Sequence, residues 1–396
     1  MTIIENARVI RNGEILTGER IAFDRGIIVP TPQKPDPADR YLDAQGNYVS
    51  AGFVDIHVHG GGGADFLDAT EDAFLTAANL HAQYGTTTLL PTATSSSQKE
   101  TLVMMRAYER AQATNLTGAD MPGLHFEGPY FSPEQCGAQD PSQLRTPDPK
   151  EYLAVLDAGS RILRWSAAPE LPGSADFAKE LIARGVLPAI GHSNAEFDET
   201  AEAFQNGFTH VTHLYSCTST VHRKNAIRHA GVVESAYLTD GMTVEIIADG
   251  IHLPPALLQM VYRFIGPDRT ALVTDAIRGA GMPDGPSILG SLKNGLPILI
   301  EDGVGKLPDR TALAGSVATM NRLVWNMVHL AQVPLPDAVK MASQTPATIV
   351  GLTDRGTLDP GKRADIVIFD DELQIHQNIV GGRTVYARND QALQQV

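Results

Sequence analysis

The chain has 396 residues with 43% hydrophobic and 19% charged side chains, a composition typical of a folded protein with room for one large and one small domain. Its formal net charge of −15 argues against nucleic acid and anionic membranes as general partners, although a local basic pocket could still hold a small anion. Only Cys136 and Cys217 occur, and we find neither a signal-peptide pattern nor a stretch of roughly 20 apolar residues, so we expect a cytoplasmic protein without a disulfide framework or a membrane span.

The first 50 residues predict short strands. Asn12-Gly13 is typical of a two-residue hairpin turn, and the prolines from Pro30 to Pro37 predict a loop. After Gly356 the pattern returns to strands, with the apolar run Ile366-Val-Ile-Phe369. We therefore predict that residues 1–51 and 350–396 form one small β-sandwich domain built from both ends of the chain.

Residues 52–349 predict strands that alternate with helices. Helical spacing over residues 70–83, 174–184 and 196–206 ends each time near a glycine. Eight parallel strands alternating with helices favour a closed (β/α)8 barrel. An open doubly wound sheet is the alternative, but residues 60–63 lack the G-x-G-x-x-G spacing that leads into a helix in such sheets. The strands are expected at residues 52–59, 86–92, 123–127, 164–169, 187–192, 210–215, 244–248 and 271–275.

The pair His57-Val-His59 ends the first of these strands, just before four glycines. Residues two apart on a strand point to the same face, so both imidazoles project where a flexible loop begins. Alone, the pair is weak evidence for a metal, because such histidines are often ordinary hydrogen-bonded residues. Other predicted strands end in further polar residues: Glu127, His192, His213 and Asp275. Active sites of such barrels form at the C-terminal ends of the strands, so we predict that all six residues converge there around a metal site.

The residue types suit hydrolysis assisted by a metal. Imidazole and carboxylate ligands hold zinc, iron, manganese or cobalt, and a divalent ion lowers the pKa of a bound water toward ~7. Glu127 could bridge two ions, and Asp275 could carry a proton from that water to a leaving amine. Two other histidines are expected outside the ligand set. His210 should pack on the opposite strand face, and His125 should lie deeper in the barrel, either supporting the site or filling a layer.

These motifs resemble the amidohydrolase superfamily over nearly the whole chain, and most closely its N-acetylglucosamine-6-phosphate deacetylase family. The resemblance implies one or two divalent ions per chain, zinc before iron, manganese or cobalt. It assigns His57, His59 and Glu127 to one ion, and Glu127, His192 and His213 to the other. It also implies that Glu127 replaces the carboxylated lysine of hydantoinases. The segments that carry the closer resemblance are Leu124-His-Phe-Glu-Gly-Pro129, Gly191-His-Ser-Asn194, Thr212-His-Leu-Tyr215, Ile247-Ala-Asp-Gly-Ile-His252, Leu272-Val-Thr-Asp-Ala276 and Leu313-Ala-Gly-Ser316.

The resemblance also implies a substrate site, although two segments depart from the family pattern. Ala138-Gln139 stand where many members have a histidine facing the substrate, and a Gln amide can donate a hydrogen bond but cannot be cationic. Ser216-Cys217 stand in a loop that holds the sugar phosphate in relatives. The basic stretch 222–229 could be an ordinary solvated loop. The resemblance instead implies that Arg228, together with His252, binds the phosphate from the neighbouring subunit of a homodimer.

The expected activity is hydrolysis of the acetamide of N-acetylglucosamine-6-phosphate to glucosamine-6-phosphate and acetate. A metal-bound hydroxide would attack, with Asp275 as general acid and base. Two alternatives stay open. One is an amidohydrolase acting on a different N-acyl hexosamine, such as the galactosamine form, or on a cyclic amide. The other is a catalytically inactive barrel that only binds a ligand, against which the intact set of site residues argues.

Overall fold

A computed structural model describes residues 1–32, 34, 36 and 38–388. Its centre is one sheet of eight parallel strands whose spatial order follows the chain. The first and last strands meet where a parallel bridge joins Val58 to Ala276 and the His59 N–H donates to the Ala276 carbonyl at 2.8 Å. The predicted (β/α)8 barrel is therefore confirmed. Its strands are β8 (Phe53–Val58), β11 (Thr86–Ala93), β12 (Leu124–Glu127), β13 (Ile162–Ala167), β14 (Leu187–Ile190), β15 (His210–Val211), β18 (Thr243–Ile246) and β19 (Thr270–Leu272).

Six of these strands end one to four residues earlier than the sequence predicts, β14, β15 and β19 among them. We expected β14, β15 and β19 to run on to His192, Tyr215 and Asp275, but they end at Ile190, Val211 and Leu272. The backbone of His192, His213 and Asp275 is left-handed, with φ of 46°, 29° and 47°. A non-glycine residue in this region costs energy and cannot continue a strand, so the chain turns off the barrel at each of these residues.

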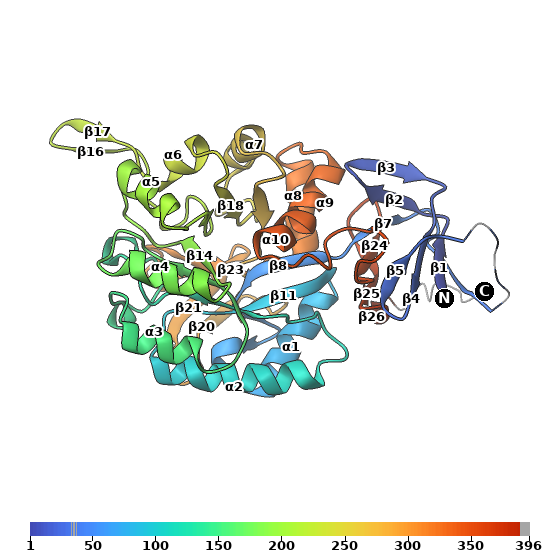
Figure 1. The fold of residues 1–396 in the computed structure, drawn as a ribbon, viewed down its shortest axis with the longest axis horizontal. Coiled ribbons are helices and arrows are strands. Elements are labelled where there is room, and N and C mark those ends of the chain that lie inside the picture. Colours follow the sequence, from blue (N-terminus) through green and yellow to red (C-terminus); the bar gives the residue numbers. More distant parts are fainter. Residues whose placement is uncertain (33, 35, 37, 389–396) are drawn as a thin grey trace.

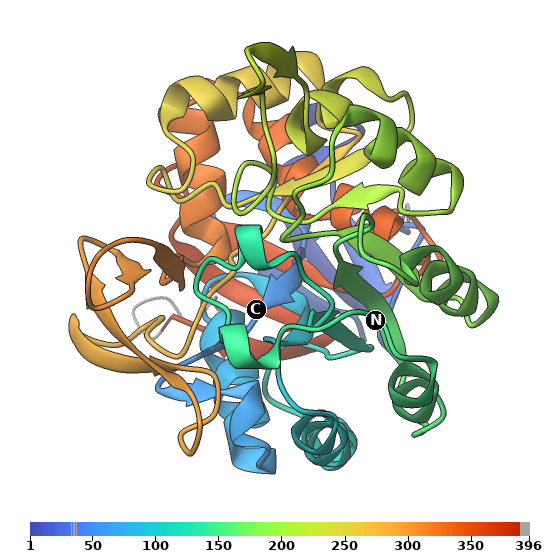
Figure 2. The same ribbon diagram turned by 90° about the vertical axis from the view of Figure 1, so that its left-hand side faces the viewer.

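Helices surround the barrel strands (Figures 1 and 2). The three predicted helices are confirmed to within one residue at each end, as α1 (Glu71–Ala82), α4 (Ser174–Ala183) and α5 (Phe197–Gln205). The Thr70 side chain accepts a hydrogen bond from the Ala73 N–H and so caps the start of α1. The other helices are α2 (Gln98–Thr114), α3 (Pro149–Leu156), α6 (Val232–Leu238), α7 (Pro255–Phe264), α8 (Met320–His329), α9 (Leu335–Ala342) and α10 (Gln344–Ile349).

Strands from both ends of the chain lie together on the right of Figure 1. One sheet has the order β5-β4-β1-β6, and the other has the order β26-β25-β24-β7-β2-β3. In the second sheet Ile366 pairs with Ala51, which joins the two termini. Asn12 and Gly13 form the predicted turn between β2 and β3, with φ of 53° and 78°. The strands are β1 (Thr2–Glu5), β2 (Arg8–Arg11), β3 (Glu14–Thr17), β4 (Ile21–Asp24), β5 (Ile27–Val29), β6 (Arg40–Asp43), β7 (Tyr48–Ala51), β24 (Ile366–Phe369), β25 (Ile375–Val380) and β26 (Arg383–Ala387).

The two sheets share an apolar cluster that includes Ile4, Val9, Phe23, Ile366 and Ile379. The division into a small domain of residues 1–51 and 350–396 and a barrel of residues 52–349 stays a prediction. Parts of the predicted loop between residues 30 and 37, namely residues 33, 35 and 37, and the tail 389–396 lie outside the described residues.

An antiparallel sheet between β19 and α8 was not predicted. It has the order β20-β21-β22-β23 and consists of β20 (Gly285–Leu289), β21 (Leu296–Glu301), β22 (Val304–Lys306) and β23 (Leu313–Ser316). Two hairpins lie elsewhere, β9 (Gly60–Gly61) with β10 (Ala64–Asp65), and β16 (His222–Lys224) with β17 (Ile227–His229). Short 3-10 helices cover residues 66–68, 133–135 and 141–143. Among the helices in the described part of the chain, none combines the length and the apolar character needed to cross a membrane.

Candidate active site

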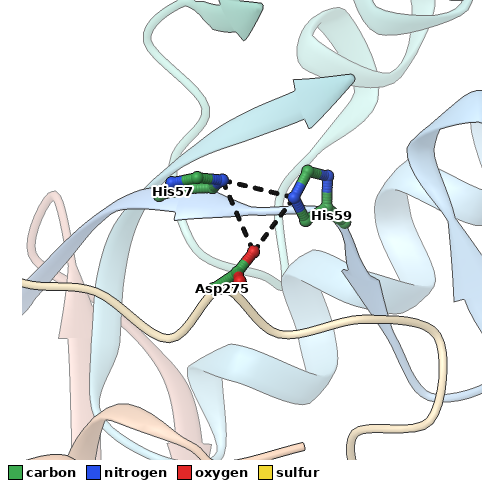
Figure 3. Close-up of side chains that lie close together, drawn as sticks. All are labelled: His57, His59 and Asp275. Carbon is green, nitrogen blue, oxygen red and sulfur yellow. Dashed lines mark hydrogen bonds and ion pairs between the residues drawn. The ribbon is translucent and has the colours of Figure 1, made fainter. Parts of the chain in front are cut away.

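One compact group of side chains consists of His57 in β8, His59 directly after it, and Asp275 three residues after the end of β19 (Figure 3). The Nε2 atoms of His57 and His59 lie 3.2 Å apart. The Oδ1 atom of Asp275 lies 3.4 Å from the first of these nitrogens and 3.0 Å from the second. All three residues are buried. Their nitrogen and oxygen atoms therefore point into one small space.

A second group lies beside the first and consists of Glu127, His192 and His213. The Oε1 atom of Glu127 lies 3.2 Å from Nε2 of His192 and 2.9 Å from Nε2 of His213. The same carboxylate lies 3.5 Å from Nε2 of both His57 and His59, through its two oxygens. All six predicted residues thus meet, and Glu127 lies between the two groups.

The charges in these groups shift one another's pKa values. Burial alone would raise the pKa of Glu127, but His57, His192 and His213 hold it well below its usual range. Burial alone would lower the pKa of His59, yet Asp275 and Glu127 raise it to about 9. The pKa of Asp275 is lowered against its burial by His57 and His59. The carboxylates are therefore held ionised and the site favours bound positive charge.

The donor set fits divalent cations. Each group offers three atoms of imidazole nitrogen or carboxylate oxygen within 4.8 Å of one another. Two imidazole lone pairs that face each other at 3.2 Å, as those of His57 and His59 do, repel unless a proton or a cation lies between them. These ligand types are those of zinc and related transition metals. Four histidines and two carboxylates so close together are otherwise costly to bury.

Hydrogen bonds on the far side of the rings orient two of the histidines. The Nδ1 atom of His57 lies 2.7 Å from Oε1 of Glu245, and Nδ1 of His192 lies 2.8 Å from the carbonyl of Gln135. Within the part of the chain that the structure describes, Nδ1 of His59 and of His213 has no hydrogen-bond partner.

Sequence reasoning missed the charged cluster beneath the site. Glu245 lies in β18, Arg164 lies in β13, and both are fully buried. His210, expected only to pack, has its Nε2 atom 3.3 Å from Oε2 of Glu245. The signal was present, because an acidic residue in the apolar segment Val244-Glu-Ile246 and a basic one in Ile162-Leu-Arg164 need a partner when buried.

The contacts of His125 decide between the two roles that the sequence left open for it, supporting the site or filling a layer of the barrel. Its Nδ1 and Nε2 atoms lie 3.2 Å from Oγ1 of Thr92 and 2.8 Å from Oγ of Ser166. Its ring lies edge-on to that of His57, with centroids 4.6 Å apart. Burial drives its pKa well below the usual value, with the charge of Arg164 acting in the same direction. His125 is therefore a layer residue that packs against a site histidine without bonding to it.

A cavity of about 280 Å³ opens over both groups. It is lined by five of the predicted substrate residues, Ala138, Gln139, Ser216, Cys217 and His252. Leu289 and Leu313 from the antiparallel sheet complete one wall. The segment that carries Gln139 includes two short helices that lie across the barrel mouth in Figure 2. The cavity therefore sits directly above the groups that could hold metal.

Gln139 makes a contact that differs from the one expected. Its Nε2 atom donates to Oε2 of Glu127 at 2.7 Å, and its Oε1 atom accepts from the Ser95 N–H at 2.8 Å. Since a backbone N–H can only donate, this bond fixes which end of the amide faces Glu127. Gln139 thus supports the carboxylate between the two groups, in addition to lining the cavity.

The two residues expected to bind phosphate lie apart. His252 lines the cavity of its own chain, where its Nδ1 atom lies 2.6 Å from Oδ2 of Asp249. The resemblance implied that His252 acts from a neighbouring subunit, whereas here it lines the cavity of its own chain. Arg228 lies exposed on β17, in the hairpin that projects at the upper left of Figure 1, and it does not line the cavity.

Comparison with known proteins agrees with this geometry. Residues 48–386 match the model of the amidohydrolase family. The chain is 34% identical to the N-acetylglucosamine-6-phosphate deacetylase of Lysinibacillus sphaericus over 352 residues, which cover 86% of each protein. It is 32% identical to the enzyme of the same name from Danio rerio over 96% of this chain and 92% of that protein.

Solved structures of enzymes with that name also share the fold. A point mutant of the Mycobacterium smegmatis enzyme in complex with N-acetyl-D-glucosamine-6-phosphate superposes with a TM-score of 0.88 at 32% identity, covering 98% of this chain and 99% of that one. The Pasteurella multocida enzyme gives a TM-score of 0.90 at 26% identity, covering 98% and 100%. The chain therefore belongs to the amidohydrolase family and, within it, to the N-acetylglucosamine-6-phosphate deacetylase family.

Proposed function

We propose that this protein hydrolyses the acetamide of N-acetylglucosamine-6-phosphate, releasing acetate and glucosamine-6-phosphate. The observation that carries the proposal is the pair of buried donor groups, with Glu127 between them, at the floor of a cavity large enough for a sugar. The relatives and solved structures compared above carry the name of this activity.

The two groups would hold one or two divalent ions, with zinc the first choice and iron, manganese or cobalt the others. His57, His59 and Glu127 are proposed for one ion, with Asp275 beside them, and Glu127, His192 and His213 for the other. A bound divalent cation supplies Lewis acidity, which lowers the pKa of water and polarises an amide carbonyl.

Asp275 is proposed as the proton carrier. Its Oδ1 atom lies 3.0 Å from Nε2 of His59, and its side chain also lines the cavity. Asp275 can therefore accept a proton from a water molecule at the donor groups and deliver that proton to a departing amine nitrogen in the cavity. An ionised carboxylate, which His57 and His59 favour here, is the form needed to accept that proton.

The other residues would bind and orient the sugar. Ala138, Gln139, Ser216, Cys217 and His252 line the cavity. Arg228 is proposed to contact the phosphate of a substrate bound to the other subunit of a homodimer, because the exposed hairpin places it away from its own cavity. A planar guanidinium binds phosphate oxygens in pairs, which suits this role. We propose a cytoplasmic location for the enzyme.

The test is acetate release from a panel of N-acetyl hexosamines, each with and without 6-phosphate, by protein loaded with one defined metal at a time. The proposal expects the highest kcat/KM with the phosphorylated gluco sugar. A preference for the galactosamine form would identify that sugar as the substrate instead. An absence of acetate with every sugar and metal would support the alternative of a catalytically inactive barrel that only binds a ligand.

A further inference from the structure

One buried carboxylate lies beneath both donor groups. Glu245 is fully buried, and its Oε1 atom lies 2.7 Å from Nδ1 of His57. The same oxygen accepts the backbone N–H of His213 at 3.2 Å. His57 belongs to one group and His213 to the other, so a single side chain from β18 contacts a member of each.

The environment of Glu245 keeps it negatively charged. The guanidinium of Arg164 bonds both carboxylate oxygens, through Nη2 at 2.9 Å and through a shorter bond from Nη1. The Nη2 atom also donates to Oγ1 of Thr212 at 2.8 Å. A buried charge is tolerated when it is paired and hydrogen-bonded in this way.

This charge decides which nitrogen of His57 carries the proton. An ionised carboxylate can only accept, so Nδ1 of His57 must be the donor. A neutral imidazole with its proton on Nδ1 presents the lone pair of Nε2 on the opposite side of the ring. That Nε2 atom is the one that lies 3.2 Å from His59 and 3.5 Å from Glu127.

We infer that Glu245, paired with Arg164, is a positioning residue that holds His57 in the tautomer and orientation needed to bind a divalent cation. This inference rests on the proposed function, since it concerns a metal position of that same site. Contact with a carboxylate behind a ligand histidine also raises the basicity of the ring and removes its freedom to rotate. Through the His213 backbone, Glu245 further ties the position of the second group to the first.

The experiment compares stepwise Zn²⁺ affinity, by competition with a chelator, for the metal-free wild type and two variants. Glu245→Gln removes the charge, and Glu245→Asp keeps the charge but shortens the side chain by one methylene and so withdraws it from His57. Each variant should bind one of its two ions about 10- to 100-fold more weakly, the usual effect of losing such a partner.

His210→Gln is the matched control. His210 is equally buried and contacts the other oxygen of Glu245, at 3.3 Å, but it belongs to neither donor group. Its variant should keep both affinities near the wild-type values, even if the melting temperature of the metal-free protein falls. A purely structural role for Glu245 would lower the melting temperature in all three variants without a selective loss of one ion.

Folded Glu245 variants that bind both ions as the wild type does would overturn the inference and leave the proposed function standing. If neither variant folds, Glu245 serves the fold and the inference is also overturned. A wild type that binds no Zn²⁺ would instead overturn the proposed metal centre on which the inference rests.

Discussion

Asp275 contacts both parts of the proposed site, because its carboxylate lies 3.0 Å from His59 and also lines the cavity. Asp275→Asn keeps the shape of the side chain but removes its ability to accept a proton. We expect kcat to fall by about 10²-fold or more, the usual scale for general acid–base catalysis. Metal content, measured by elemental analysis, should stay close to that of the wild type. Near-normal turnover would remove Asp275 from the proton path.

Gln139 offers a second test at the residue scale, through its 2.7 Å bond to Glu127. Gln139→Ala removes a hydrogen bond to a charged group, worth about 1.5–3 kcal/mol, so kcat/KM should fall roughly 10- to 100-fold. Gln139→Glu places a second carboxylate against Glu127 and should be more damaging. Steady-state kinetics of both variants check this order. An equal loss in the two would show that repulsion at Glu127 plays no part.

Some residue-scale properties could be predicted from the sequence and others could not. The alternation of a strand places His57 and His59 on one face, and a local rule is enough to predict that. The role of Gln139 needed the fold, because Ser95 and Glu127, which fix its amide, lie 44 and 12 residues away.

At the scale of elements, β8 and the residue directly after it supply the pair of histidines for one metal position. Replacing both, as His57→Asn with His59→Asn, removes two of the three donors of that group and leaves the Glu127 group intact. We expect the metal content found by elemental analysis to fall from about two ions per chain toward one, because zinc sites need three or four protein ligands. A double variant that keeps the full load would show that the strand pair is not a ligand pair.

The hairpin of β16 and β17 is the second element with a prediction. Arg228→Ala should lower kcat/KM roughly 10- to 100-fold on the phosphorylated sugar, as expected for a lost charge-assisted hydrogen bond. The loss should largely vanish on the unphosphorylated sugar, which presents no anion. Lys224→Ala is the control on the same hairpin, because Lys224 already contacts Glu196 at 3.4 Å. Equal losses of Arg228→Ala on both sugars would assign Arg228 to structure.

Elements with regular spacing were predictable, whereas those made by long-range pairing were not. Helices α1, α4 and α5 follow from their local sequence and their flanking caps. The sheet β20-β23 escaped prediction, because its strands are short and two of them, β20 and β21, include a proline. What stabilises it is pairing with neighbouring strands and an apolar cluster under them that includes Ile277 and Ile300.

At the scale of the whole molecule, the proposed dimer can be tested by mixing two impaired variants. Arg228→Ala lacks the guanidinium and Asp275→Asn lacks the proton carrier, so each homodimer is impaired. If Arg228 acts in the site of the other subunit, each hybrid dimer has one complete site. About half of the dimers in an equal mixture are hybrids, so the mixture should regain about a quarter of wild-type activity. The measurement is turnover after dissociation and reassociation. No recovery, with hybrids shown by mass spectrometry, would contradict completion of the site across subunits.

The sequence by itself determined the alternating strands and helices, and therefore the barrel and the end at which the six predicted site residues meet. These properties follow from local rules, since strand and helix periods are written in neighbouring residues. Only the tertiary structure decided that His252 lines the cavity of its own chain and that Arg228 does not. It also decided that Glu245 and Arg164 pair beneath the site, 81 residues apart in the sequence. Such partners depend on how the barrel closes, which a sequence pattern does not encode locally.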